Sequence, residues 1–188
     1  IVLVGISVSC TKNFEDWQKD TKNASEVPGE VLFTNAQKAL ADQVAETSVN
    51  RNNHKLWSQF WTETTYTDEA NYDLINRNIP NWAFRVFYRD ILRDLREAKM
   101  LISSTAVTAI EEDAKNNKLQ LIEVLEVYTF QRLVDLFGNI PYSQALDIDA
   151  TLNPAYDDGM TIYKDLVDRL DAAMLAMKTG AESYGHAD

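Results

Sequence analysis

The residue types that most often carry out catalysis are few in this chain and far apart. The two histidines, His54 and His186, do not share the His-Glu-x-x-His spacing that places two imidazoles on one face of a helix to hold zinc. The single cysteine, Cys10, allows neither an intrachain disulfide nor a cysteine-based zinc cluster. The chain also lacks a Gly-x-Ser-x-Gly nucleophile elbow and a glycine-rich phosphate loop. We therefore expect no metal centre, no nucleophilic active site and no cofactor.

One acidic stretch has the spacing of a calcium-binding loop, in which oxygen ligands at alternate positions converge on the cation. Its members are Asp147, Asp149, Thr151, Asn153 and Asp158. However, Leu152 stands where such a loop needs glycine, and the last position has Asp in place of a bidentate Glu. We interpret the stretch as a solvated acidic linker.

A second acidic group raises the question of glycoside hydrolysis. Its members are Glu63, Asp68, Glu69 and Asp73. Glycosidases hold two carboxyl groups roughly 5 to 9.5 Å apart across the scissile bond, and spacing along a chain does not report that distance. Because the chain has 29 Asp and Glu residues, such a group arises readily by chance. We expect a protein without catalytic activity, and a glycoside hydrolase is the less favoured alternative.

Aromatic side chains gather in and around the same polar segment. They are Trp57, Trp61, Tyr66, Tyr72 and Trp82. A sugar ring packs its C–H faces on flat aromatic side chains, and its hydroxyls hydrogen-bond with Asn, Asp and Glu. The spacing of the three tryptophans favours core positions, whereas the polar neighbours of the two tyrosines favour exposure. The candidate ligand-binding residues are Tyr66, Asn71, Tyr72 and Trp82.

The composition is that of an acidic globular protein. Hydrophobic residues make up 45% of the chain and charged residues 25%, a balance that can bury a core. Eighteen Lys and Arg against 29 Asp and Glu give a net charge of −11, which repels phosphate backbones. The 188 residues fit one domain, or one domain and part of another, and nucleic acid is not an expected partner.

The first ten residues, Ile-Val-Leu-Val-Gly-Ile-Ser-Val-Ser-Cys, form an apolar run too short to span a bilayer. A buried strand or a helix start would account for it, but we favour the apolar end of a secretory signal. A cysteine placed like Cys10 becomes the diacylated N-terminus of bacterial lipoproteins. We therefore expect residues 1–9 to be residual signal peptide and residues 10–33 to hold a lipidated Cys10 and an extended polar tether.

Helical periodicity begins after that tether and predicts the elements that position the aromatic segment. Thr34 and Gln37 fit a capping box, which predicts a first helix that ends near Asn50. A second, shorter helix that packs on the first is predicted from the apolar set Leu56, Trp57, Phe60 and Trp61. The polar segment 62–81 should then be a long exposed loop.

Two longer helices follow the loop. Pro80 suits the first turn of the next helix, whose apolar face steps by three or four residues through Phe84, Phe87, Ile91, Leu95, Ala98 and Ile102. Segment 118–137 is apolar around its circumference, so we expect a helix buried on most sides, starting as early as Val107. Gly138 can cap this helix and Pro141 prevents its continuation.

The last helix is expected from about Met160 to Met177. Its predicted apolar face consists of Tyr163, Leu166, Val167, Leu170, Ala173, Met174 and Met177. Five helices in pairs, with no alternating strand pattern, predict an all-α fold of stacked helical hairpins, and a tetratricopeptide-like stack is one such arrangement.

Several segments together resemble a known family. Tyr128-Thr-Phe-Gln-Arg-Leu-Val-Asp-Leu-Phe-Gly-Asn-Ile-Pro-Tyr142 resembles the long helix and Phe-Gly-Asp-x-Pro-Tyr corner of SusD/RagB-type nutrient-binding lipoproteins, with Asn139 where Asp is commoner. Asn153-Pro-Ala-Tyr-Asp157 and the stretch from Gln59 through Tyr72 are similar to further blocks of this SusD-like family. With Cys10 upstream, the resemblance spans nearly the whole chain.

The resemblance implies the fold and the function. It implies a tetratricopeptide-like all-α fold, of which residues 34–188 would be the N-terminal part of a larger domain. It also implies a lipoprotein anchored to the outer membrane of a Bacteroidetes-type bacterium and facing the exterior. Its function would be to capture oligosaccharide or another nutrient and deliver it to a SusC-like TonB-dependent transporter. A helical scaffold that binds only protein is the alternative from a different class.

Overall fold

The computed structural model describes residues 26–48 and 52–185, so that Cys10, His186 and the predicted signal segment 1–9 lie outside the described residues. In chain order the elements are α2 (Gly29–Ala45), α3 (His54–Trp57), α4 (Ile79–Arg85), the π-helical η1 (Val86–Leu92), α5 (Arg93–Ser104), α6 (Glu112–Phe137), β1 (Ile140–Pro141), β2 (Tyr156–Asp157) and α7 (Gly159–Ala176). The regular structure of the described chain is therefore helical apart from one two-stranded sheet, which confirms the predicted all-α class.

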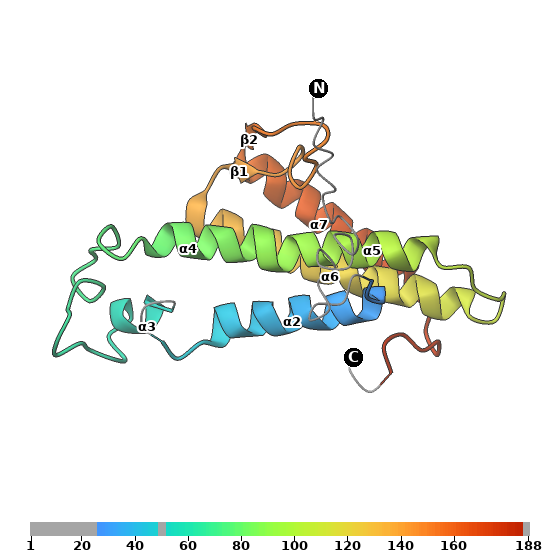
Figure 1. Cartoon of the computed structure of the whole chain (residues 1–188), viewed down its shortest axis with the longest axis horizontal. Helices are drawn as coiled ribbons and strands as arrows, with labels where there is room; N and C mark the ends of the chain where they lie inside the picture. The colour runs from blue at the N-terminus through green and yellow to red at the C-terminus, as the bar shows by residue number, and fades with distance from the viewer. Residues whose placement is uncertain (1–25, 49–51, 186–188) are drawn as a thin grey trace, which may run out of the picture.

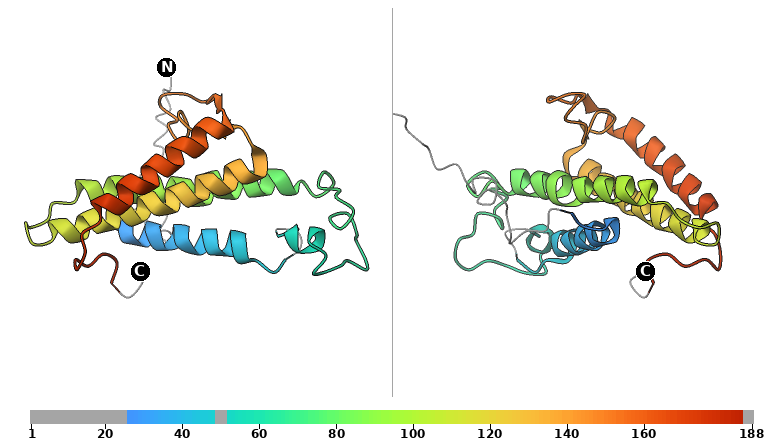
Figure 2. Two further views of the ribbon diagram at one scale, coloured as in Figure 1. Left: turned by 180° about the vertical axis from the view of Figure 1, so that it is seen from behind. Right: turned by 45° about the vertical axis from the view of Figure 1, so that its right-hand side comes forward.

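The long helices form antiparallel hairpins. Elements α4, η1 and α5 join end to end into one rod, residues 79–104, and α2 runs beside this rod in the opposite direction (Figure 1). Helix α6 turns back along α5, and α7 then crosses α6 at an angle (Figure 2). Each long helix thus contacts the one before it, and the predicted stack of helical hairpins is confirmed.

The core lies where these helices meet, and it follows the helical spacing of apolar residues. The predicted face of the rod is buried at Phe87, Ile91, Leu95, Ala98 and Ile102. Helix α2 contributes Phe33, Ala36 and Leu40, and α6 contributes Ile122, Phe130 and Leu133. Pro80 lies in the first turn of α4, as predicted. Each helix therefore has one apolar face, and it packs with that face against its neighbours.

Helix α2 begins at Gly29, five residues before the predicted start, so residues 29–33 are helix and not tether. The predicted capping box is wrong, because Thr34 lies inside the helix and its Oγ1 donates to the carbonyl oxygen of Glu30 at 2.9 Å. Gly29 allows α2 to pack closely on α5. A Cβ there would lie 2.7 Å from Cγ1 of Ile102 and 2.9 Å from the carbonyl oxygen of Ala98.

The predicted second helix is reduced to the single turn of α3. Gln59 has a φ of 60°, a left-handed conformation that a helix does not accommodate, so the chain leaves the helical path before Phe60. Phe60 is 82% exposed and Trp61 is also exposed, so their predicted packing on the first helix is wrong. Leu56 is buried, as predicted.

Two further predictions concern burial. Residues 118–137 of α6 are buried on most sides, as predicted, and only Tyr128, Asp135 and Leu136 among them are exposed. The buried stripe of α7 is narrower than predicted, since Val167 and Met174 are exposed. This difference follows from the packing, because α7 has α6 as its main neighbour.

The corner after α6 joins this helix to α7. Gly138 caps α6, as predicted, with a positive φ of 73°, but its ψ of −112° lies outside the left-handed helical conformation that we expected. Ile140–Pro141 then pairs antiparallel with Tyr156–Asp157, and the Oδ1 of Asn139 accepts a hydrogen bond from the backbone N–H of Gly159 at 3.0 Å. The Asp157 carboxylate accepts the backbone N–H of Ser143 at 2.7 Å, and this hydrogen bond holds the pKa of Asp157 below its usual value.

A network of charges ties α5, α6 and α7 together. Arg169 donates to Glu123 at 2.5 Å, to Glu126 at 2.9 Å and to the hydroxyl of Tyr142 at 2.7 Å. Lys99 pairs with the same two carboxylates, at 2.5 and 3.2 Å. Every charge in this cluster therefore has an opposite charge beside it, as buried charges require.

In the described part of the chain, no helix has the length and apolar character needed to cross a membrane.

Candidate functional site

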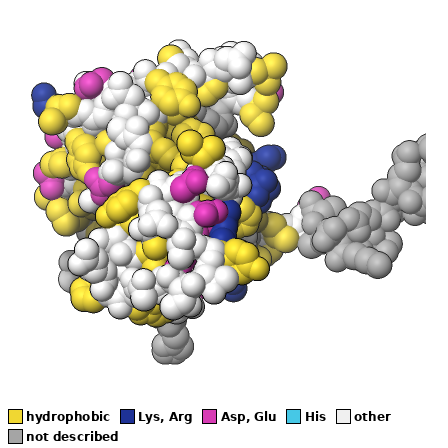
Figure 3. Space-filling view, turned by 90° about the vertical axis from the view of Figure 1, so that its left-hand side faces the viewer, with side chains coloured by type: hydrophobic (Ala, Val, Ile, Leu, Met, Phe, Trp, Pro, Cys, Tyr) yellow, Lys and Arg dark blue, Asp and Glu magenta, His cyan; other side chains and the backbone are white. Residues whose placement is uncertain are grey.

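The aromatic segment lies at one end of the helical stack. It connects α3 to α4 through turns, on the left in Figure 1, and Figure 3 looks directly onto this end. Hydrophobic side chains are spread over this face between acidic and basic ones (Figure 3). Tyr66 is 77% exposed and Tyr72 is 68% exposed, which confirms the exposure expected for both.

A chain of contacts links the two exposed tyrosines. The ring of Tyr72 stacks on Trp57 with a centroid distance of 5.6 Å, and the Trp57 Nε1–H donates to the carbonyl oxygen of Glu69 at 3.1 Å. The Glu69 side chain is fully buried, and its Oε1 lies 3.3 Å from Nε of Arg77. The guanidinium of Arg77 in turn lies over the ring of Tyr66, 5.6 Å from its centroid. An ion pair between the buried Glu69 and the partly exposed Arg77 thus connects the parts of the loop that present the two rings.

The same segment stores backbone strain. Among the described residues other than glycine, five have a positive φ, and four of them lie here: Gln59, Tyr66, Tyr72 and Asn78. A residue with a side chain in this conformation costs of order 1–3 kcal/mol and persists only where its surroundings enforce it. Strain of this kind gathers at functional sites, and here it includes both exposed tyrosines.

A cleft opens beside Tyr72. We call it the aromatic cleft, and its lining consists of Leu56, Gln59, Phe60, Trp61, Thr62, Ala70 and Tyr72. Its volume is about 360 Å³, within the range of pockets that take small organic ligands. The Nζ of Lys55 lies 4.8 Å from the ring centroid of Trp61. Sequence reasoning missed Phe60 and Trp61 as site residues because their spacing continues that of Leu56 and Trp57.

The other two predicted ligand residues lie in different surroundings. Asn71 is exposed in the loop, where its Nδ2 donates to the backbone oxygen of Thr67 at 2.9 Å and to the Thr67 hydroxyl at 3.1 Å. Trp82 is half-buried on α4 and packs against the core, with the guanidinium of Arg85 over its ring at 5.0 Å. Asn71 therefore shares the exposed loop with the tyrosines, whereas Trp82 belongs to the helix that follows.

Three of the four loop carboxylates considered for hydrolysis have roles in the loop itself. Glu63 accepts the backbone N–H of Ala70 at 3.1 Å, and Asp73 accepts that of Ile75 at 3.0 Å. Glu69 is the fully buried partner of Arg77. Their contacts assign these three side chains to holding the turns.

The residues with calcium-loop spacing are likewise engaged in local structure. Asp147 accepts the backbone N–H of Ala150 at 3.0 Å, and Asp158 caps α7 by accepting that of Thr161 at 2.9 Å. Within residues 26–48 and 52–185, no three or more His, Cys, Asp or Glu side chains gather in a way that could hold a metal ion.

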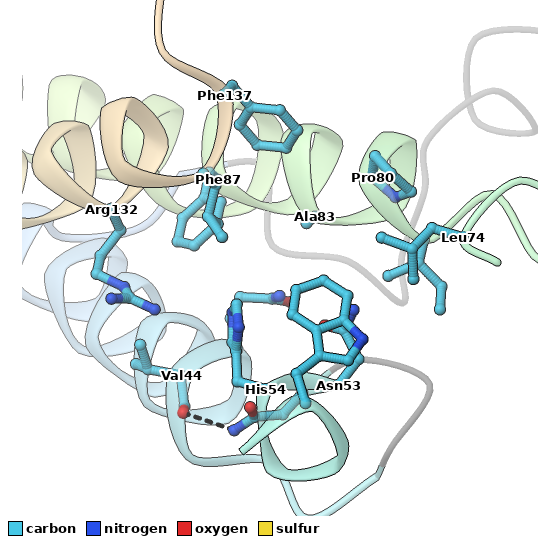
Figure 4. Close-up of a pocket in the computed structure, with 14 residues that line it drawn as sticks. Val44, Asn53, His54, Leu74, Pro80, Ala83, Phe87, Arg132 and Phe137 are labelled. Carbon is cyan, nitrogen blue, oxygen red and sulfur yellow. Dashed lines mark hydrogen bonds between the residues drawn. The ribbon is translucent and has the colours of Figure 1, made fainter. Parts of the chain in front are cut away.

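A second hollow lies near the loop, between α2, α3, α4, η1 and α6. We call it the Arg132 pocket, and its volume is about 140 Å³. Its lining includes Gln43, Asn53, His54, Trp57, Phe87 and Arg132. In Figure 4, Arg132 extends from α6 toward Val44 on α2 at one end of the pocket, and Leu74 and Pro80 lie at the other end.

The polar groups of this pocket are basic or neutral. Partial burial, with the positive charge of Arg132 nearby, lowers the pKa of His54 and so favours the neutral imidazole. Nε of Arg132 is buried and has no hydrogen-bond partner in the described structure. Sequence reasoning did not single out Arg132, and the only signal was one cation within the apolar stretch from Tyr128 to Phe137.

The comparisons with known proteins agree with the helical architecture. A family model named SusD-like_2, described as starch-binding associating with outer membrane, matches residues 21–188. No curated protein matches the chain.

Proposed function

The chain belongs to the SusD-like family of starch-binding, outer-membrane-associated proteins, and from this membership we propose that it captures oligosaccharide at its aromatic end without cleaving it. The observation that carries the proposal is the aromatic cleft, where Phe60, Trp61 and Tyr72 are all exposed beside a loop rich in hydrogen-bonding groups. Apolar ring faces with polar groups at their edges are what a sugar ring needs.

Strain and rigidity support the same assignment. Tyr66 and Tyr72 both have a positive φ, and the buried Glu69–Arg77 pair holds the loop between them. A rigid surface loses little conformational entropy when a ligand binds, so its contacts contribute more to affinity. We propose Tyr66, Asn71 and Tyr72 as ligand contacts, with Phe60 and Trp61 added from the structure. Trp82, half-buried on α4, is the fourth of the ligand contacts that we propose from the sequence.

The finer features of the function are also proposals. We propose that Cys10 carries a diacyl anchor that attaches the protein to the outer membrane and that the aromatic end faces the exterior. We further propose that the bound oligosaccharide passes to a SusC-like TonB-dependent transporter. Support comes from the lipoprotein-type spacing at Cys10 and from the family's association with the outer membrane. Each buried methylene of an acyl chain adds about 0.8 kcal/mol to membrane binding.

The binding proposal can be tested by titration calorimetry against a panel of neutral and acidic oligosaccharides. Tyr72→Ala and Trp61→Ala should each weaken binding roughly three- to tenfold, the value of one aromatic stacking contact. Tyr156→Ala is the matched control, because Tyr156 is comparably exposed at 66% but lies on β2. Melting curves confirm that each variant folds. If no member of the panel binds, glycan capture is refuted and a protein-binding scaffold becomes the better interpretation.

The anchor and the transporter need separate experiments in cells. Cys10→Ser should move the protein from the membrane fraction to the soluble fraction and abolish labelling by radioactive fatty acid. Affinity purification of the protein with wild-type Cys10 should recover an outer-membrane barrel. Retention of Cys10→Ser in the membrane fraction would contradict the anchor, and purification without a barrel would contradict the transporter.

A further inference from the structure

The Arg132 pocket has an electrostatic character opposite to that of the chain as a whole. The chain carries a net charge of −11, yet none of the residues that line this pocket is Asp or Glu, and Arg132 is its one fully charged group. No carboxylate of the described residues lies within ion-pair distance of Arg132. The lining of the pocket therefore carries a net positive charge, although the chain as a whole is acidic.

The Arg132 side chain is half-buried, and its Nε is fully buried with no hydrogen-bond partner among the described residues. Transfer of an ionised group away from water is costly unless an opposite charge or hydrogen bonds compensate it, and an arginine cannot lose its proton to avoid that cost. The Lys99–Glu123–Arg169 network shows how the same fold satisfies its structural charges. Arg132 departs from that pattern, so a bound anion is the partner that its position favours.

The other residues that line the pocket indicate the size and the hydrogen-bonding groups of such an anion. The walls at Phe87, Ala83 and Pro80 are apolar, whereas Asn53 and Gln43 bring side-chain amides that donate and accept hydrogen bonds. The volume of about 140 Å³ is below the roughly 300 Å³ of a typical small-molecule pocket. It therefore suits one small charged group attached to a larger body outside.

The aromatic cleft lies next to this pocket. Trp57 lines the Arg132 pocket and stacks on Tyr72, which lines the cleft. A ligand that lies over the aromatic rings could therefore extend a charged substituent toward Arg132. Arginine binds a planar carboxylate with two parallel hydrogen bonds, a geometry that a neutral hydroxymethyl group does not match.

We propose that the Arg132 pocket binds the carboxylate of an acidic sugar unit, a hexuronate, so that the protein selects an anionic oligosaccharide. This inference rests on the proposed glycan-binding function and specifies its ligand class. Arg132 provides the charge, Asn53 and Gln43 provide hydrogen bonds to the sugar, and the aromatic cleft holds the neighbouring units.

The test compares a trimer of galacturonic acid with maltotriose, a neutral trisaccharide, by titration calorimetry. Wild-type protein should bind the acidic trimer at least tenfold more tightly than maltotriose. Arg132→Gln should reduce the affinity for the acidic trimer roughly ten- to a hundredfold, the usual effect of removing hydrogen bonds to a charged group. Arg93→Gln is the matched control, since Arg93 is exposed on α5 and does not line the pocket.

A direct measurement guards against a folding defect in the variant. In wild-type protein, the NMR resonance of the Arg132 Nε–Hε group should shift when the acidic trimer is added and should not shift with maltotriose. Equal affinities for the two trimers, or unchanged acidic affinity in Arg132→Gln, would overturn the inference. If a neutral glycan binds and depends on Tyr72 while acidic glycans show no advantage, only this inference fails. If neither kind of glycan binds, the proposed function fails with it.

Discussion

Replacement of Arg169 by methionine should be strongly destabilising. The guanidinium of Arg169 bridges Glu123 and Glu126 and donates to the Tyr142 hydroxyl, and its side chain is 23% exposed. Methionine keeps the apolar stem and removes the charge and all three hydrogen bonds. The two carboxylates, 17% and 10% exposed, would then share Lys99 alone.

The loss of stability depends on the two carboxylates that remain buried after Arg169 is replaced. Removal of one partner from a buried ion pair costs about 3–5 kcal/mol, because the remaining charge stays buried without compensation. Lys99 continues to offset part of this cost, and the remaining exposure of Arg169 reduces it further. We therefore expect the free energy of unfolding to fall by about 3 kcal/mol at neutral pH, a large share of a typical domain's 5–15 kcal/mol.

The pH dependence supplies a second signature. Burial alone would raise the pKa of Glu123, but hydrogen bonds from Arg169 and Lys99 hold it below its usual value. A lowered pKa in the folded state contributes stability above the unfolded pKa, and that stability is lost as the pH falls through the folded pKa. Without Arg169 the pKa of Glu123 rises, so the variant's deficit should be largest near neutral pH and shrink toward about pH 4.

Urea unfolding followed by circular dichroism at both pH values measures these deficits. Arg89→Met is the control, because Arg89 is exposed on η1 and pairs only with the adjacent Asp90. The control should leave the free energy of unfolding unchanged. A loss in Arg169→Met of less than about 1 kcal/mol, the value of a surface pair, would refute the reasoning. A loss that does not change with pH would do so as well.

Three further changes test the backbone and the corner. Gly29→Ala should lower the free energy of unfolding by about 1–3 kcal/mol in urea titrations. The new Cβ would lie 2.9 Å from a backbone oxygen of α5, which cannot move without shifting that helix. An unchanged unfolding midpoint would contradict this close packing. Gly138→Ala should cost a similar amount, about 1–3 kcal/mol, for a different reason: no atom lies within 4 Å of the added Cβ, but its φ of 73° is strained for alanine. Asp157→Asn should lower the melting temperature at neutral pH, since the lowered pKa of Asp157 makes its carboxylate stabilising there. The difference in melting temperature from wild type should vanish in acid, where that carboxylate is protonated. A difference that persists in acid would show that charge is not the cause.

Much of the fold follows from local pattern. The apolar face of the 79–104 rod, the proline at the start of α4 and the glycine that ends α6 were all predicted correctly, because each depends on residues within one or two helical turns. The early start of α2 could not be predicted in this way. It depends on the contact of Gly29 with Ile102, far away in the chain, and local spacing does not contain that contact.

The candidate site was predictable only where polar neighbours indicated exposure. Tyr66 and Tyr72 were identified because Thr, Asn and Asp surround them. Phe60 and Trp61 share the helical spacing of the buried Leu56, and only the left-handed Gln59 removes them from the helix. The Arg132 pocket could not be predicted from the sequence, because its walls come from α2, α3, α4, η1 and α6 and depend on how all of them pack.

Most of the described positions that break local rules lie together, and Leu146, with a φ of 66°, is the exception. Gln59, Tyr66, Tyr72 and Asn78 have left-handed backbones, and Arg132 has a buried Nε without a partner, all around the loop end of the stack. Where α5, α6 and α7 meet, by contrast, each charge of the Arg169 network is paired. The Arg169 network is thus built for stability. The loop end instead retains backbone strain and a charge without compensation, which indicates that a function other than stability determines its structure. The proposed ligand would supply that reason, since a glycan bound as we propose would cover the strained tyrosines and bring an anion to Arg132.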